Sequence, residues 1–358
     1  MKIVLATSIY PPEVGRPAAY IEELARRLAR EHDVTIVAYS DAPSDDARLM
    51  RVSKRHPRWR RSLHYFVAVS RAARSADLIY VQNAMSAGLP VALVNLLRGT
   101  PYLVKFWGDE AWERACQRHL TTKPLEDFLV HPEGGSTIRL MMAVEQFVLR
   151  RAAIVTTSSA HVQGMLVRAY GLYPERVVVH PVPADRPELL PFEAVREPHR
   201  IAYTPRLATA TDRIAVENAH TLIQQTYPDA TLAIGEHISK AEAWHIARSA
   251  SVSLAYSTYD ATPYAILRSF AAGTPVIAAD VNGVSEIVHD GETGLLVPQG
   301  DAVALARAIS RVFEDGSLAR RLAENGAKIL AKRFSWEAHL GELRELFRSV
   351  LSGPRHIT

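Results

Sequence analysis

The chain has very little cysteine: Cys116 is the single one among 358 residues. One thiol can form neither an intramolecular disulfide nor a cysteine-based metal cluster, so a reducing, cytoplasmic compartment is expected. The 14 histidines show no H-E-x-x-H motif and no paired Cys/His spacing. The sequence therefore predicts no metal site.

Long apolar runs are also missing. A helix needs roughly 18 apolar residues in succession to cross a bilayer, and no such stretch occurs in the sequence, so no membrane-spanning helix is predicted. The short apolar stretch at residues 1–9 ends at Pro11 and Pro12 without a small-residue cleavage site. It is therefore predicted to be a buried strand and not a signal peptide.

What the chain does contain is an alternation of short apolar, β-branched runs with helical stretches. Its length of 358 residues suits two domains. Short apolar strands separated by helices are typical of a parallel sheet that is covered on both faces, so a doubly wound α/β class is predicted. The expected strands are residues 2–6, 34–38, 78–81, 102–106, 153–157, 176–180, 200–203, 231–234, 252–256 and 275–279, and the expected helices include 18–30, 214–226, 301–332 and 336–351.

A proline-rich segment separates the two alternations. Residues 180–198 contain five prolines and no periodic pattern. Proline restricts both itself and the residue before it to extended conformations. We therefore expect an N-terminal Rossmann-like domain over residues 1–184, a linker over 185–198 and a shortened C-terminal Rossmann-like domain over 199–336.

Basic residues cluster between residues 48 and 61, although the net charge of the whole chain is only +4. Basic residues with embedded aromatic side chains suit an anionic membrane surface or a phosphorylated acceptor. They also suit nucleic acid, which we do not expect as the partner. A solvated loop after the second strand accounts for the same composition. The residues expected to contact membrane or acceptor are Arg51, Arg55, Arg58, Trp59, Arg60 and Arg61.

Residues 256–297 carry the most informative pattern: a strand, a polar loop, a helix, a Gly-Thr-Pro stop, a second strand and an Asn-Gly loop. In an open α/β sheet, ligands bind beyond the carboxyl ends of the strands, so loops 257–263 and 280–286 are expected to face a ligand. A helix that begins near Pro263 would direct free N–H groups there, as a diphosphate requires. A purely structural βαβ unit would show the same pattern.

This stretch resembles the signature of the family-four retaining glycosyltransferases, whose fold is called GT-B. The matching residues are Ala271, Gly273, Pro275, Val276, Ile277, Gly283, Glu286, Ile287, Val288, Gly291, Gly294, Leu296 and Val297. Runs that begin at Tyr10, Trp107 and Phe334 are also similar to family elements. The resemblance extends over nearly the whole chain. It implies two Rossmann-like domains that face a central cleft, with residues 337–358 crossing back onto the N-terminal domain.

Several positions of the C-terminal half differ from the family pattern. Where the family has two glutamates eight positions apart, this chain has Asp260 and Arg268, and an arginine cannot accept a hydrogen bond from a ribose hydroxyl. Arg206 matches the family's diphosphate-binding arginine, but Thr211 stands in the place of the lysine, and Arg213 is the nearest substitute.

The N-terminal half departs from the family as well. The usual Gly-Gly of the first loop is Gly15-Arg16, and Trp107 stands where many members have an active-site histidine. Only 53 residues separate Arg206 from Asp260, which is short by comparison with the family. About one βα unit is therefore expected to be missing from the C-terminal domain.

The resemblance implies a metal-independent retaining glycosyltransferase that needs no cofactor and takes a nucleotide-sugar donor as its substrate. The implied acceptor is a glycan, a lipid-linked sugar or a small molecule, in cell-envelope glycan, polysaccharide or glycolipid synthesis, at the inner face of the membrane or in the cytoplasm. The implied catalytic residues are Asp109, Arg206 and Asp260, and the implied donor-binding residues are Gly15, Arg16, Arg206, Arg213, Thr262, Pro263, Tyr264, Arg268 and Glu286. Two alternatives stay open: a non-catalytic relative that serves as a binding or scaffold subunit, and a transferase with an unusual phosphorylated donor.

Overall fold

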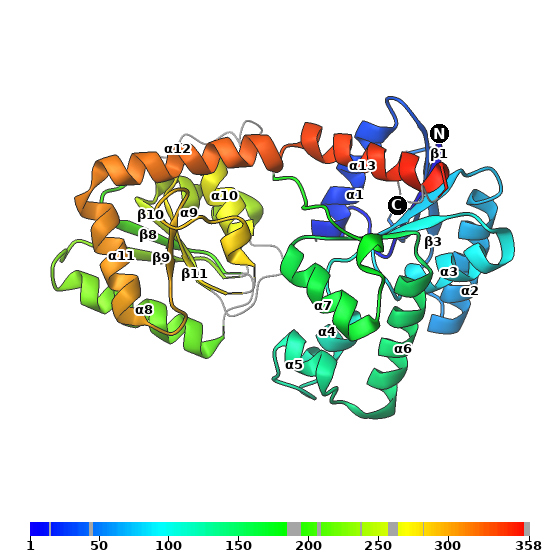
Figure 1. Cartoon of the computed structure of the whole chain (residues 1–358), viewed down its shortest axis with the longest axis horizontal. Coiled ribbons are helices and arrows are strands. Elements are labelled where there is room, and N and C mark those ends of the chain that lie inside the picture. The colour runs from blue at the N-terminus through cyan, green and yellow to red at the C-terminus, as the bar shows by residue number, and fades with distance from the viewer. Residues whose placement is uncertain are drawn as a thin grey trace. The chain divides into compact units, whose positions relative to one another are not determined.

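The computed structural model describes residues 1–13, 16–42, 46–184, 195–205, 209–236, 238–256, 264–281 and 283–353. These residues form two compact units, and each unit is a sheet flanked by helices (Figure 1). The first unit comprises Met1–Ser158, Val162–His180 and Glu342–Thr358, and the second comprises Ser159–His161 and Pro181–Gly341.

The sheet of the first unit has seven strands in the order β3-β2-β1-β4-β5-β6-β7, and its pairings are parallel. β1 (Lys2–Thr7) lies between β2 (Asp33–Tyr39) and β4 (Leu78–Val81). All four residues of β4 are apolar and buried, as expected for a strand that is covered on both faces. The other strands are β3 (Leu49–Val52), β5 (Tyr102–Lys105), β6 (Ile154–Thr157) and β7 (Val177–Val179).

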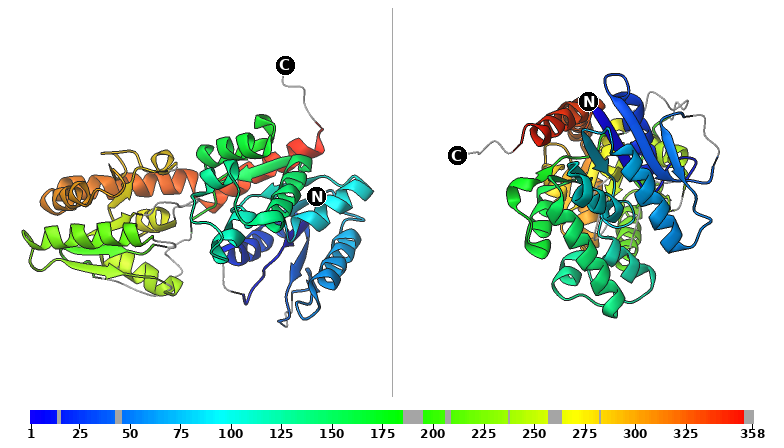
Figure 2. Two further views of the ribbon diagram at one scale, coloured as in Figure 1. Left: turned by 90° about the horizontal axis from the view of Figure 1, so that it is seen from below. Right: turned by 90° about the vertical axis from the view of Figure 1, so that its right-hand side faces the viewer.

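Helices cover both faces of this sheet, as two further views show (Figure 2). On one face, the Tyr80 hydroxyl lies 3.3 Å from that of Tyr20 in α1 (Arg16–Leu28), and the Tyr80 ring packs edge-on against Phe347 of α13 (Trp336–Leu351). On the opposite face, α3 (Gly88–Arg98) packs between α2 (Arg58–Ala72) and α6 (Gly135–Arg151). The remaining helices are α4 (Glu110–Gln117), α5 (Leu125–Val130) and α7 (Ala160–Tyr170).

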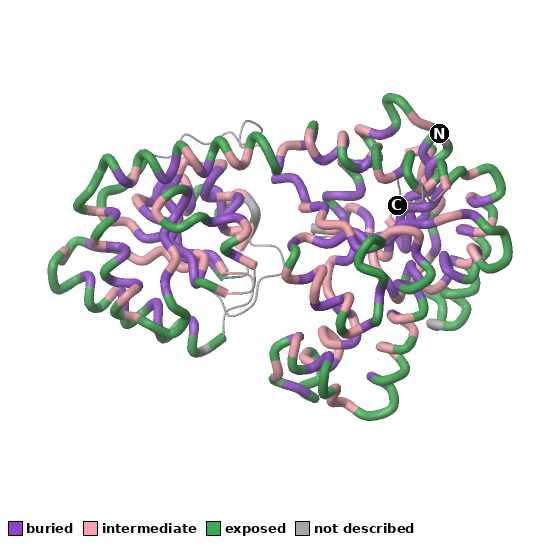
Figure 3. Tube along the Cα trace, in the orientation of Figure 1, coloured by how far each residue is buried: buried purple, intermediate pink, exposed green. Residues whose placement is uncertain are grey.

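The sheet of the second unit has five strands in the order β12-β11-β10-β8-β9, and its pairings are also parallel. Two buried cores lie on its two faces (Figure 3). α8 and α11 pack together on one core, α9 and α10 lie on the other side, and α12 packs on α10. The strands are β8 (Arg200–Tyr203), β9 (Thr231–Ile234), β10 (Val252–Ala255), β11 (Val276–Ala279) and β12 (Leu295–Val297), and the helices are α8 (Ala210–Gln224), α9 (Lys240–Ser249), α10 (Tyr264–Ala272), α11 (Ala302–Glu314) and α12 (Gly316–Arg333).

The predicted fold class is confirmed, because both units are doubly wound α/β domains with parallel sheets. Every predicted strand is present, and its ends agree with the prediction or differ by one residue. The single helical stretch predicted over residues 301–332 is wrong, because Asp315 ends α11 and its carboxylate caps α12 by accepting from the backbone N–H groups of Ser317 and Leu318. Most of the predicted linker, residues 185–194, lies outside the described residues.

The contact between α12 and α10 gives a stability prediction. A Cβ atom at buried Gly326 would overlap the ring of Phe270, which is itself almost wholly buried. We predict that Gly326→Ala lowers the free energy of unfolding of the second unit by about 1–3 kcal/mol, the usual cost of overpacking. Urea unfolding followed by circular dichroism measures this change.

Gly341→Ala on α13 is the matched control, because a Cβ atom there meets nothing within 4 Å. Alanine should stabilise that helix by roughly 0.5–1 kcal/mol. If both variants changed stability in the same direction and by the same amount, the close packing of α12 on α10 would not be the cause.

Candidate active site

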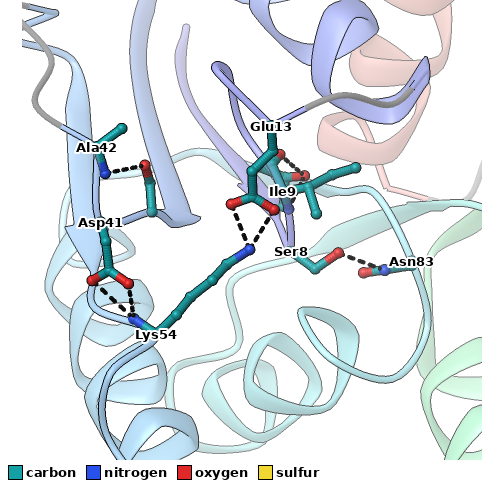
Figure 4. Close-up of polar contacts among 9 residues, drawn as sticks. Ser8, Ile9, Glu13, Asp41, Ala42, Lys54 and Asn83 are labelled. Atoms are coloured by element: carbon teal, nitrogen blue, oxygen red, sulfur yellow. Dashed lines mark hydrogen bonds and ion pairs between the residues drawn. The ribbon is translucent and has the colours of Figure 1, made fainter.

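The carboxyl edge of the first sheet gathers polar loops from four strands. The chain leaves β1 toward β2 on one side and later returns to β4 on the other, and ligands bind at such a switch point in open α/β sheets. Here the Asn83 side-chain amide, just after β4, donates to the Ser8 hydroxyl, just after β1, at 2.9 Å. Figure 4 shows this link between the two loops.

Lys54 joins the loops after β1, β2 and β3 at that edge (Figure 4). Its ammonium group forms an ion pair with Glu13, in the loop after β1. Its backbone N–H donates to both carboxylate oxygens of Asp41 at 3.2 Å, in the loop after β2. Lys54 itself follows β3, so one residue of the basic segment holds the loop that leads to Gly15, which itself lies outside the described residues.

An aromatic side chain borders the same edge. The Trp107 indole N–H donates to the Gln82 side-chain carbonyl at 2.7 Å, and its ring packs edge-on against Tyr20 at 5.4 Å. Gln82 Nε2 and Asn83 Oδ1 are buried and have no hydrogen-bond partner among the described residues. Sequence reasoning noted Trp107 but missed both amides, whose only signal was their position directly after a predicted strand.

Asp109, which the resemblance implied to be catalytic, lies at the start of α4. Its side chain is completely buried and caps α4, accepting from the Trp112 N–H at 2.7 Å and from the Tyr170 hydroxyl. Buried Glu145 of α6 accepts from the Glu110 N–H at 2.7 Å. In this structure the buried Asp109 carboxylate is a helix cap, and its catalytic role stays a prediction.

The same cluster holds shared protons. The Tyr170 hydroxyl contacts a carboxyl oxygen of Asp109 and one of Glu145, yet a phenol has a single proton to donate. One of the two carboxyls must therefore be protonated to complete both contacts. Burial raises the pKa of both Asp109 and Glu145. The nearby Asp109 carboxyl raises the pKa of Glu145 further.

Lys105, the last residue of β5, is another buried charge that sequence reasoning missed. It lies 1% exposed, and its ammonium group donates to the His180 backbone carbonyl at 2.5 Å. Burial lowers the pKa of Lys105 to about 7, against a smaller opposing effect of the Glu342 carboxylate. A lysine at the end of an otherwise apolar strand was the available signal.

The carboxyl edge of the second sheet carries Arg268. The switch point of this sheet lies between β8 and β10, which pair directly. Arg268, on α10, is half-buried and donates to the hydroxyl and backbone carbonyl of Thr204, the residue that follows β8. The guanidinium is thus held at the edge where ligands are expected. It is not a free surface side chain, and Thr204 is a partner that the sequence did not indicate.

Several predicted site residues lie outside what the structure describes. These are Gly15, Arg206, Asp260, Thr262 and Pro263, together with the side chain of Arg16. Tyr264 is described, and it is the first residue of α10.

Arg213 and Glu286 both have other contacts within the second unit. Arg213 is exposed on α8 and forms ion pairs with Glu217 at 2.9 Å and Glu236 at 3.3 Å. Glu286 accepts from the backbone N–H groups of Ala160 and His161, at 2.8 and 2.9 Å, in the first turn of α7. Donor binding by either residue stays a prediction that would require these contacts to be exchanged.

The basic segment, residues 48–61, is not the solvated loop that was one interpretation of its composition. It contains a strand and the start of a helix. Residues 49–52 form β3, an edge strand parallel to β2, and α2 begins at Arg58. The Arg51 guanidinium donates to the Ala42 carbonyl at 2.5 Å, and Arg61 lies over the ring of Tyr39. The sequence analysis missed this strand because two of the four residues from 48 to 51 are arginines, which obscure the apolar pattern of a strand. Arg55, Trp59 and Arg60 are exposed, while the side chain of Arg58 lies outside the description.

Both halves of the chain match known protein families. Residues 17–183 match the model described as "Glycosyl transferase 4-like domain", and residues 216–329 match "Glycosyl transferases group 1". Each half of the chain thus contains a domain that matches one of these two glycosyl transferase family models. The resemblance found in the sequence is confirmed at this level.

Similar proteins include two sugar transferases and a synthase. Lipopolysaccharide core biosynthesis glycosyltransferase LpsE of Rhizobium meliloti is 44% identical over 82 residues, 23% of this chain and 24% of that protein. Alpha-D-kanosaminyltransferase of Streptomyces kanamyceticus is 34% identical over 26% of this chain and 24% of that protein. The chain thus spans about a quarter of these two relatives. Alpha-maltose-1-phosphate synthase of Mycolicibacterium smegmatis is 26% identical over 98% of this chain and 100% of that protein.

Solved structures agree on the fold. Sucrose-phosphate synthase from Thermosynechococcus elongatus has a TM-score of 0.73 at 19% identity, covering 98% of this chain and 99% of that one. HepE of Anabaena, solved in complex with UDP, has a TM-score of 0.71 at 17% identity, covering 98% of this chain and 100% of that one. The chain therefore has the GT-B fold.

The carboxyl cluster predicts how stability depends on pH. Burial raises the pKa of Glu110 to about 7, above the value of about 4.3 expected for an unfolded chain. The folded state therefore keeps its proton longer, and the free energy of unfolding should fall as pH rises from about 4 to about 7. We predict that Glu110→Gln, which keeps the acceptor for the Met85 N–H, reduces this slope in urea unfolding.

The matched control is Glu345→Gln, at an exposed position of α13 in the same unit. This variant should keep the slope of the natural chain. An identical pH dependence in all three proteins would contradict the raised pKa of Glu110.

Proposed function

We propose that the chain is a retaining glycosyltransferase that transfers a sugar from a nucleotide-sugar donor to an acceptor. The observation that carries this proposal is the match of each half to a glycosyltransferase family model. Similar structures of HepE are complexes with UDP and with UDP-glucose, which supports a nucleotide-sugar donor here. The retaining outcome comes from the family resemblance.

The donor would bind at the carboxyl edge of the second sheet. Arg206 follows β8, and Arg268 reaches the same loop through Thr204. We propose that Arg206 and the N-terminus of α10, with Thr262, Pro263 and Tyr264, neutralise the leaving diphosphate, so that no metal is required. Asp260 would bind the transferred sugar, and Gly15 and Arg16 would bind the donor phosphates.

The acceptor would bind at the carboxyl edge of the first sheet. Sugar hydroxyls both donate and accept hydrogen bonds, and the amide side chains of Gln82 and Asn83 lie at this edge, although Gln82 Nε2 and Asn83 Oδ1 are buried and would have to be uncovered to bind a sugar. The Trp107 indole, fixed by Gln82, borders the same edge and could stack on an apolar sugar face. These groups support a hydroxyl-rich acceptor.

We propose a role in cell-envelope glycan, polysaccharide or glycolipid synthesis, at the inner face of the membrane. Similarity to LpsE, a lipopolysaccharide core glycosyltransferase, supports this setting. Among the residues that the structure describes, none of the helices combines the length and apolar character needed to cross a bilayer.

A second candidate is a transferase whose donor carries an extra phosphate or carboxylate. Arg268 favours it, because a guanidinium anchored by Thr204 at this edge can bind a second anionic group in bidentate fashion. A repurposed, non-catalytic relative would use the same positions differently, and Thr211 in the place of the family lysine is the observation in its favour.

The diphosphate role of Arg206 gives a kinetic prediction. Arg206→Ala should lower turnover by roughly two to three orders of magnitude, because a charge that stabilises the leaving group is lost. Turnover is measured by release of the nucleoside diphosphate. Arg307→Ala, an exposed arginine on α11, should leave turnover unchanged. Equal turnover in both variants would remove Arg206 from the donor site.

A substitution at Arg268 distinguishes an ordinary nucleotide-sugar donor from a donor that carries an extra anionic group. If it binds an anionic group of the donor, Arg268→Glu should weaken donor binding by tenfold or more, since attraction becomes repulsion. If the site takes an ordinary nucleotide, the family residue glutamate should preserve or improve binding. Calorimetric titration with UDP, GDP and ADP distinguishes these outcomes, with Arg307→Glu as the control. Micromolar binding by the natural chain that improves in Arg268→Glu would exclude the phosphorylated-donor candidate.

A further inference from the structure

Positive charge is strongly segregated in the first unit. From Ala47 to Ala76 the sequence has eight arginines and one lysine, and no aspartate or glutamate. This stretch contains β3 and all of α2. Arg55, Arg60, Arg71 and Arg74 are exposed. Elsewhere in the chain acidic and basic residues are mixed, which is why the net charge is only +4.

An apolar ridge lies on the same helices. Trp59, Leu63 and Val67 are spaced four residues apart on α2 and are 65%, 52% and 37% exposed. On α3, Leu93, Leu96 and Leu97 are 40%, 50% and 73% exposed. Contiguous exposed apolar side chains are unusual on a monomer surface and mark an interaction site. We call these six residues the α2–α3 ridge.

The two halves of the ridge face the same side. α2 and α3 pack against each other, and the Arg98 guanidinium of α3 donates to the Ser70 hydroxyl of α2 at 3.1 Å. Both helices cover one face of the sheet, with Tyr65 and Val91 buried toward it. Side chains exposed on both helices therefore point away from the sheet, and Figure 1 shows α2 and α3 side by side.

We infer that the α2–α3 ridge is a docking surface for an anionic lipid bilayer. The ridge would enter the boundary between headgroups and acyl chains, while the arginines bind the lipid phosphates. A second copy of the chain is a poor occupant, because the same dense positive charge would face itself. Nucleic acid would leave six apolar side chains against phosphates. The bilayer alone satisfies both the charge and the apolar surface.

This inference deepens the proposed function, on which it rests for the lipid-linked class of acceptor. Docking through α2 and α3 would hold the first unit, which carries the proposed acceptor edge, at the membrane surface. A lipid-linked acceptor could then be used without leaving the bilayer. Vesicle binding needs no turnover, so a failure of docking and a failure of transfer are observed separately.

The test is cosedimentation of the full chain with phosphatidylcholine vesicles, with and without phosphatidylglycerol, over a range of salt. The natural chain should bind the anionic vesicles, and binding should fall as salt rises. Leu96→Ser/Leu97→Ser should weaken binding by about tenfold or more at every salt concentration, because buried apolar area is lost. Arg55→Gln/Arg60→Gln should weaken binding and also reduce the salt dependence.

Val303→Ser on α11 is the matched control, since Val303 is a 51% exposed apolar residue of the second unit. It should bind like the natural chain. Trp59 gives an independent readout: brominated lipid should quench a fluorescence component that is absent in Trp59→Phe. Unchanged binding by the leucine variant, or no quenching of Trp59, would overturn insertion of the ridge. Loss of a dimer in the leucine variant, seen by light scattering, would assign the ridge to a second copy instead.

Discussion

Each unit depends on one central strand that pairs in parallel with a neighbouring strand on each side. β1 pairs with β2 and β4, and β8 pairs with β9 and β10. Parallel strands require helical crossovers, which cover both faces of the sheet and bring the chain out of every strand at the same edge. Polar loops therefore gather at that edge. This is why Asn83 meets Ser8 in one unit and Arg268 meets Thr204 in the other.

Covering both faces also forces some polar groups into the interior. Asp109 and Glu145 keep a proton between them because the Tyr170 hydroxyl can satisfy only one carboxylate. Lys105 is held by a backbone carbonyl in a setting that disfavours its charge. Such groups rigidify the elements behind the site when all are satisfied. These groups lie inside the scaffold, whereas the polar loops lie at the edge of the sheet.

At the β3 edge of the first sheet, the basic residues both protect an edge strand and tie neighbouring loops together. An unprotected edge strand invites pairing with other chains, and charged side chains prevent it. β3 is such an edge; Arg51 lies within it, and Arg48 and Lys54 flank it. Lys54 also ties the loops after β1 and β2 together. The basic segment is therefore part of the fold, and only its outer arginines are left for a partner.

The sequence alone determined the fold class, the two alternating halves and nearly every strand, because apolar periodicity and proline placement are local properties of the chain. It also indicated the family through the spacing of residues from Ala271 to Val297. It could not reveal that Asp109 is a buried cap, that Thr204 holds Arg268 or that Leu97 joins Trp59 in one exposed ridge. Those facts depend on contacts between residues far apart in the chain, and burial, partnership and surface continuity exist only once the helices have packed on their sheets.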